Sequence, residues 1–167
     1  MKWTRYFVLV SWAIAVGAVA ADDPNAVVGR WAATDSVIEV VATDGTLRAT
    51  IIAILYPVYR EGEDGPVGAA KVDLKNPDQG QRARPIVGMD LLSDYAFKDG
   101  KWQGNIYDPK SGKTYKSQMT VSSDGKLLMR GYIGTPMLGR TQEWIRASTC
   151  LGDIPKMLAS VNLNSCG

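Results

Sequence analysis

Residues 98–133, KDGKWQGNIYDPKSGKTYKSQMTVSSDGKLLMRGYI, decide the fold class. Turn signals stand at Asp99-Gly100, Ser111-Gly112 and Asp124-Gly125, and runs rich in β-branched and aromatic residues lie between them. Short runs of this kind between Gly- and Asp-containing turns are typical of antiparallel hairpins. This part of the chain is therefore predicted to be a meander of strands.

The strand expected over 113–121 shows the alternation of a half-buried strand. One face is mostly apolar and the other is polar, with a period of two. The same face carries Tyr115, Ser117, Met119 and Val121. Along the rest of the chain, the spacing of the turn signals predicts eight strands in all. They are expected at 29–33, 36–42, 46–55, 86–92, 101–107, 113–121, 126–133 and 139–146.

Eight strands in up-and-down order favour closure, because an open sheet leaves two unpaired edges. The expected fold is all-β, an antiparallel up-and-down β-barrel wide enough for side chains or one small ligand. Two regions stand outside the meander. Residues 56–85 form an excursion rich in Gly, Pro and charge, and residues 147–167 form a tail with a short helix expected after Ile154-Pro155.

The first twenty residues are predicted to be a secretory signal. Lys2 and Arg5 precede the uncharged run 6–20, which ends in the small residues Ala18-Val19-Ala20. A retained anchor is the alternative, but the run is shorter than the roughly 20 residues that span a bilayer. The expected organisation is 1–20 signal peptide, 21–146 barrel domain and 147–167 tail. The mature protein is expected in the periplasm or secreted, with no membrane span.

Composition excludes several classes of function. Two of the 19 basic residues lie within 1–20, so the remainder carries 17 basic and 17 acidic residues, which is unlike a nucleic-acid binder. The chain has no histidine, which removes the usual histidine-dependent nucleophiles and zinc sites. We therefore expect no enzyme and no cofactor. Cys150 and Cys166 are expected to form a structural disulfide, as is common in exported proteins.

Three groups of residues have a structural interpretation, and the last two have a functional alternative as well. Trp31 near one barrel end is expected to lie under a cationic side chain in a cation–π contact that seals the base. The loop 73–78 offers oxygen ligands for Ca²⁺, or is simply held by Asx-turns. Arg82 and Arg84 could clamp a carboxylate or phosphate, or could equally pair with Asp73 or Asp90 at the barrel rim.

The last hairpin carries the strongest candidates for ligand binding. Arg130 and Tyr132 share one face of their strand, and Arg140, Gln142 and Trp144 share a face of the next. If these faces point inward, they build a polar, aromatic-lined pocket; if outward, an ordinary solvated surface. The full set of candidate ligand-binding residues is Trp31, Arg84, Tyr107, Tyr115, Arg130, Tyr132, Arg140, Gln142 and Trp144.

An ordered series of short motifs runs through residues 27–146. It includes Gly29-x-Trp31, Ile106-Tyr107-Asp108-Pro109 and Leu138-Gly139-Arg140-Thr141-Gln142-x-Trp144. The series resembles a family of exported bacterial proteins called domain of unknown function 2147 (DUF2147). The resemblance implies a lipocalin- or calycin-like barrel and no established activity. The tail with Cys150 and Cys166 lies beyond the part that resembles the family.

The leading hypothesis is a carrier that binds a small apolar or amphipathic molecule in the barrel. The alternative is a protein-interaction module of the cell envelope, with residues 56–85 and the tail as its contact surface. An enzyme that uses Asp73, Asp108 or a tyrosine would need a general base with a strongly shifted pKa. The ligand, any protein partner and the oligomeric state stay open at this point.

Overall fold

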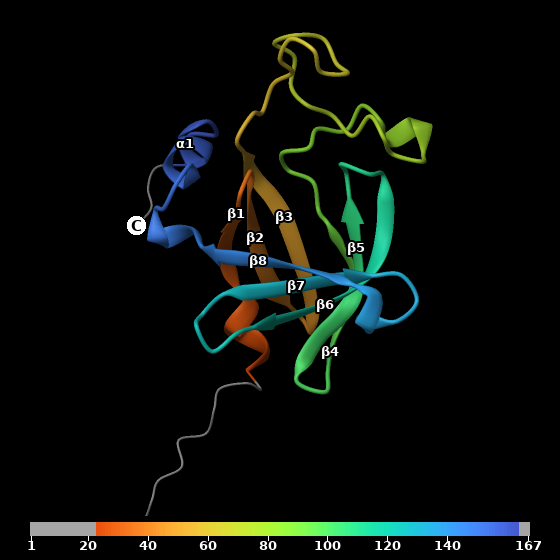
Figure 1. Cartoon of the computed structure of the whole chain (residues 1–167), viewed down its shortest axis with the longest axis vertical. Coiled ribbons are helices and arrows are strands. Elements are labelled where there is room, and N and C mark those ends of the chain that lie inside the picture. The colour runs from red at the N-terminus through yellow and green to blue at the C-terminus, as the bar shows by residue number, and fades with distance from the viewer. Residues whose placement is uncertain (1–22, 164–167) are drawn as a thin grey trace, which may run out of the picture.

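The computed structural model describes residues 23–163, and eight antiparallel strands in these residues form a nearly closed barrel (Figure 1). The sheet order is β3-β2-β1-β8-β7-β6-β5-β4, so the first and last strands of the chain are neighbours. This confirms the expected all-β, up-and-down architecture. The strands are β1 (Gly29–Ala33), β2 (Ser36–Thr43), β3 (Thr46–Ile54), β4 (Leu92–Lys98), β5 (Lys101–Asp108), β6 (Lys113–Val121), β7 (Leu127–Tyr132) and β8 (Arg140–Arg146).

The predicted strand at 86–92 is wrong in its bounds. The strand that precedes the Asp99-Gly100 turn is β4, because a tight hairpin needs its partner directly before the turn. Residues 86–91 instead cross the gap between β3 and β5. The Gly88 N–H donates to Ile51 O over 2.7 Å, and the Leu91 N–H donates to Ala49 O over 2.8 Å. This segment therefore closes most of that gap in the barrel wall, although it is not a regular strand.

The barrel interior follows the predicted alternation. On β6, Ser117 and Met119 are fully buried, and on β3 the inward positions Leu47 and Ile51 are buried as well. Ser117 Oγ hydrogen-bonds the Tyr95 hydroxyl across the interior. Gly104 faces that ring, and a Cβ there would lie 2.3 Å from a Tyr95 ring carbon, so a glycine is required on β5 at this point.

One end of the barrel is closed by the short 3-10 helix η1 (Pro24–Val27). Trp31 Nε1 donates to Val27 O, and the Arg146 guanidinium carbon lies 3.8 Å from the centre of the Trp31 ring. Arg146 also donates to Val28 O and Ala26 O, at 2.7 and 2.9 Å. The predicted cation–π seal at the barrel base is therefore confirmed.

The tail packs on the outside of the barrel. It contains the 3-10 helix η4 (Ala147–Thr149) and the helix α1 (Ile154–Ala159), which confirms the short helix expected there. The apolar side of α1 is buried against outward-facing residues of β1, β2 and β3. The buried cluster comprises Ala32, Val37, Ala53, Ala147, Ile154, Met157 and Leu158.

The long excursion between β3 and β4 lies at the end of the barrel opposite η1 (Figure 1). It contains the short 3-10 helix η2 (Gln79–Gln81) and two isolated bridges, Val58 with Ala70 and Val72 with Pro85. A further 3-10 helix, η3 (Pro136–Leu138), lies between β7 and β8. Within residues 23–163, every helix is too short or too polar to cross a membrane.

Two predictions fall on residues that the structure does not describe. The signal segment 1–20 lies wholly outside the described residues. The disulfide depends on Cys166, which also lies outside them. Both stay predictions.

Candidate functional site

A cavity of about 1280 Å³ lies between the barrel interior and the excursion. Its lining comes from six strands, β2, β3, β5, β6, β7 and β8, and from the turns and loops at the end opposite η1. The volume exceeds the roughly 300–1,000 Å³ of ordinary ligand pockets. The barrel therefore has room for a guest molecule above its packed base.

The deep part of the cavity is apolar. Ile38 and Ile51 line it from β2 and β3, and Met129 and Trp144 line it from β7 and β8. Leu91, from the segment that bridges the wall, completes this side. These residues face inward because alternation along each strand places every second side chain in the interior.

Trp144 carries one buried polar atom behind this apolar wall. Its ring is buried, and its indole Nε1 has no hydrogen-bond partner within the described part of the chain. A buried indole N–H without a partner carries a free-energy cost. The ring lines the cavity, but the Nε1 atom itself is covered by protein atoms.

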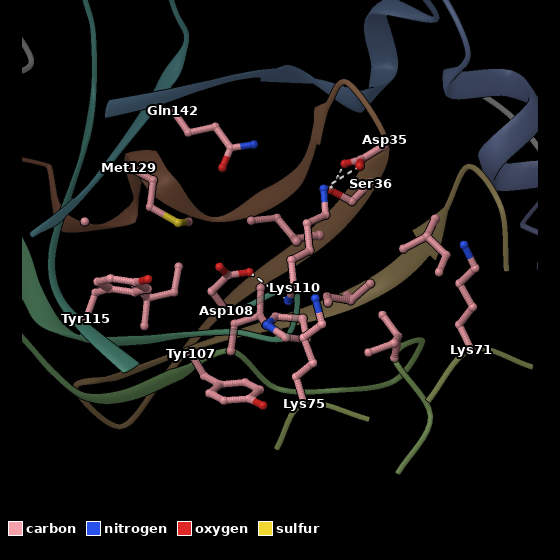
Figure 2. A pocket seen from close by; sticks show the side chains of 18 of the residues that line it. Asp35, Ser36, Lys71, Lys75, Tyr107, Asp108, Lys110, Tyr115, Met129 and Gln142 are labelled. Carbon is pink, nitrogen blue, oxygen red and sulfur yellow. Dashed lines mark hydrogen bonds and ion pairs between the residues drawn. The ribbon is translucent and has the colours of Figure 1, made fainter. Parts of the chain in front are cut away.

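The rim of the cavity is polar and charged (Figure 2). Lys110 forms an ion pair with Asp35 across the mouth, from the β5–β6 turn to the β1–β2 turn. Asp108 accepts a hydrogen bond from Ser111 Oγ over 2.7 Å. Lys75 projects toward the same region as Lys110. The cavity thus grades from an apolar interior to a polar mouth.

Beside the rim, Asp73 anchors the excursion to the barrel. Its carboxylate is almost fully buried and accepts from the Tyr107 hydroxyl at 2.8 Å, Asn76 Nδ2 at 2.7 Å and Arg84 Nη2 at 3.1 Å. Burial, followed by the hydrogen bond to Asp73, raises the pKa of Tyr107 to about 12. The carboxylate is therefore satisfied by donors from the protein itself.

Of the two interpretations of the loop 73–78, a Ca²⁺ site or a loop held by Asx-turns, the structure has the second. Asn76 Oδ1 accepts from the Asp78 N–H, and Asp78 Oδ1 accepts from the Gly80 N–H, each over 2.9 Å. These are Asx-turns. Across residues 23–163, no group of three or more acidic or cysteine ligands stands ready for a metal.

Six of the nine candidate residues line the cavity. They are Tyr107, Tyr115, Tyr132, Arg140, Gln142 and Trp144. The inward orientation expected for the face of β8 is therefore the one that the structure has.

The other three candidates lie elsewhere. Trp31 belongs to the sealed base, and Arg84 pairs with Asp73, which is the structural alternative considered for it. Arg130 lies on the outer side of β7, because the inward positions of that strand are Leu127 and Met129. Its expected place beside Tyr132 on an inward face is thus not observed.

Sequence reasoning missed the loop residues of the rim. Lys75 and Lys110 lie in connections whose position depends on tertiary packing, and no local pattern marks them. The turn at Gly112 shows this dependence, since a Cβ there would lie 1.9 Å from Lys75 O. The apolar wall of the cavity could be predicted from the sequence, because alternation along 46–55 places Ile51 on the buried face.

Comparisons with known proteins agree with this architecture. Residues 29–146 match the family model DUF2147, described as an uncharacterized protein conserved in bacteria. A solved structure of protein HP1028 from the human pathogen Helicobacter pylori, described as belonging to the lipocalin family, is similar with a TM-score of 0.58. The two chains are 25% identical, over 82% of this chain and 89% of that one. A search of curated proteins found no match.

Proposed function

The chain belongs to the DUF2147 family, and from this membership and the cavity we propose that the protein binds a small apolar or amphipathic molecule inside the barrel. The observation that carries the proposal is the cavity of about 1280 Å³, with its apolar interior and charged mouth. A molecule with an apolar chain and a polar head would bury the chain and leave the head at the rim.

Polar side chains within the lining support an amphipathic guest over a fully apolar one. Tyr115 and Gln142 place polar groups along the wall (Figure 2). A guest that removes these groups from water is favoured if it hydrogen-bonds to them, since leaving them unpaired is costly.

We propose binding, not catalysis, as the activity. A general acid or base works best with a pKa near neutrality. Among the carboxylates of the lining, Asp35 pairs with Lys110 and Asp108 accepts from Ser111. The hydrogen bond from Lys71 lowers the pKa of Glu63 to about 2, the direction opposite to that of a general acid. The lipocalin-like fold supports the same view.

Export belongs to the proposal as well. The sequence of residues 1–20 is that expected of a secretory signal, which would place the barrel in the periplasm or outside the cell. Recovery of the mature protein from a periplasmic fraction, with its first residue identified by mass spectrometry, tests this part.

The binding test is native mass spectrometry of the purified protein against a lipid panel, with a variant that fills the cavity. Gly131 lines the cavity on β7, and a Cβ there would meet only Tyr115 Cβ at 3.8 Å, an ordinary contact. Gly131→Phe should therefore fold and obstruct the interior. Leu128→Phe on the outer side of β7 is the matched control.

The expected result is a bound lipid on the wild type and on Leu128→Phe, and its loss on Gly131→Phe. A wild type that carries no lipid and binds none from the panel contradicts the proposal. So does a Gly131→Phe variant that is folded and binds as well as the wild type.

A further inference from the structure

The loop between β7 and β8, residues 133–139, exposes an unusual amount of apolar side chain. Ile133, Met137 and Leu138 are 71%, 89% and 81% exposed. Isolated exposed apolar residues are normal on a protein surface, but a cluster at one loop tip marks an interaction site. We call these three residues the apolar tip.

The loop is held in place although its tip is exposed. Arg130 Nε donates to Pro136 O over 2.7 Å, and Arg130 Nη1 donates to Thr141 Oγ1 over 2.8 Å. Gly139 packs so closely on β7 that a Cβ would lie 2.7 Å from Gly131 O. The outward direction of the apolar tip is therefore set by hydrogen bonds to the loop and by close backbone packing.

The apolar tip borders the mouth of the cavity. Ile133 and Leu138 belong to the cavity lining as well as to the exposed surface, and so does Arg140 directly after the loop. Apolar surface thus continues from the outside of the molecule into the barrel. A partner that docks on this loop would lie at the cavity entrance.

The charge around the apolar tip is positive. Residues 127–142 contain no acidic residue, and their charged residues are Arg130 and Arg140. The Arg140 side chain is exposed and makes no ion pair within residues 23–163. On the neighbouring strand β6, Lys116 lies in register with Tyr132, just before the loop. Apolar residues flanked by cations complement an anionic lipid surface.

We propose that the apolar tip docks the protein on an anionic lipid bilayer, with Met137 and Leu138 entering the boundary between headgroups and acyl chains. The neighbouring Arg140 would bind lipid phosphates. A second protein copy fits less well, because a stable interface buries roughly 800 Å² on each partner, more than a seven-residue loop tip offers. This docking goes beyond the proposed cavity function and does not depend on it.

The test is co-sedimentation of the purified protein with vesicles of phosphatidylglycerol and phosphatidylethanolamine, compared with vesicles of phosphatidylcholine. The double variant Met137→Ser/Leu138→Ser should lower the partition coefficient on anionic vesicles roughly tenfold or more, because it removes two interfacial apolar side chains. Arg140→Gln should weaken binding to anionic vesicles only. Added salt should weaken it in the same way, by screening.

Val67→Ser is the matched control, because Val67 is 72% exposed in the excursion and lies outside the cavity lining. It should sediment as the wild type does, and circular dichroism should show that all variants are folded. Equal binding by the double variant, or no preference for anionic vesicles, overturns the docking. So does a dimer that the double variant dissociates. If the wild type carries lipid in native mass spectrometry but does not bind vesicles, the docking proposal is wrong and the proposed cavity function is unaffected.

Discussion

Arg146 holds the closed end of the barrel together with a single guanidinium. It stacks on Trp31 and donates to two backbone carbonyls of the segment 26–28. At Gly29, where φ is +123°, a Cβ would lie 2.6 Å from Arg146 Nη1, so the backbone is shaped around this side chain.

We expect Arg146→Ala to lower the free energy of unfolding by about 2–4 kcal/mol, because it leaves two carbonyls unpaired and removes the cation–π contact. Arg30→Ala on β1 removes only an exposed ion pair with Glu39 and should cost less than about 1 kcal/mol. Urea unfolding measures both. Equal costs for the two variants would contradict the role given to Arg146.

The Tyr107 hydroxyl donates to Asp73 and so links the barrel to the excursion, and its pKa is a measure of this contact. Its pKa, raised to about 12 from the usual 10, means that the neutral phenol is favoured in the folded state. The stabilisation is therefore complete below pH 10 and is lost as the pH rises from 10 to 12.

In Asp73→Asn the pKa of Tyr107 should fall toward 10 but stay above it, because burial is the larger cause of the rise and Asp73 the second. Phenolate absorbance measures this, with Tyr107→Phe subtracted to remove the other tyrosines. A Tyr107 that titrates at the same pH with and without the carboxylate would show that Asp73 does not act on it.

The Trp31–Arg146 contact could be predicted from sequence, because a Trp begins the first strand, an Arg ends the last and closure brings those strands together. The Asp73–Arg84 ion pair was one of the two interpretations that the sequence allowed for Arg84. The roles of Lys75 and Lys110 could not be predicted, since they lie in loops without a periodic pattern.

At the level of elements, α1 covers a part of the barrel that alternation leaves apolar on the outside. Met157 is almost fully buried there, although α1 has only six residues. A helix this short is not stable by itself, so packing against β2 and β3 must hold it.

Met157→Ala should lower the free energy of unfolding by about 2–5 kcal/mol, as is usual for a buried large-to-small change. Leu151→Ala, at a position 62% exposed in the same tail, should cost less than about 0.5 kcal/mol. Thermal or urea unfolding compares them. If Met157→Ala is as stable as Leu151→Ala, the tail is not part of the folded core.

Strand positions were predictable where a turn signal bounded them on both sides. The hairpins around Asp99-Gly100, Ser111-Gly112 and Asp124-Gly125 lie where expected. The prediction failed at 86–92, because no turn signal precedes that segment and its hydrogen bonds to β3 come from tertiary contacts. Asp94, at φ 57° inside β4, further breaks the alternation that would have revealed that strand.

For the whole molecule, the sequence predicted closure from the strand count and from the two edges that an open sheet would leave. The sequence could not predict the size of the cavity. The excursion forms part of the cavity lining, and its position relative to the barrel depends on tertiary contacts. The base packs Trp31, Met119 and Trp102 tightly, whereas the opposite end leaves about 1280 Å³ free.

The most direct test of guest binding is calorimetric titration of the delipidated protein with dodecanoate, run at two temperatures. We predict saturable binding of one molecule per barrel, with a negative heat-capacity change because apolar surface is buried. The binding should be lost in Gly131→Phe and kept in Leu128→Phe. Heats that do not saturate, or equal binding by a folded Gly131→Phe variant, would contradict a guest in the barrel.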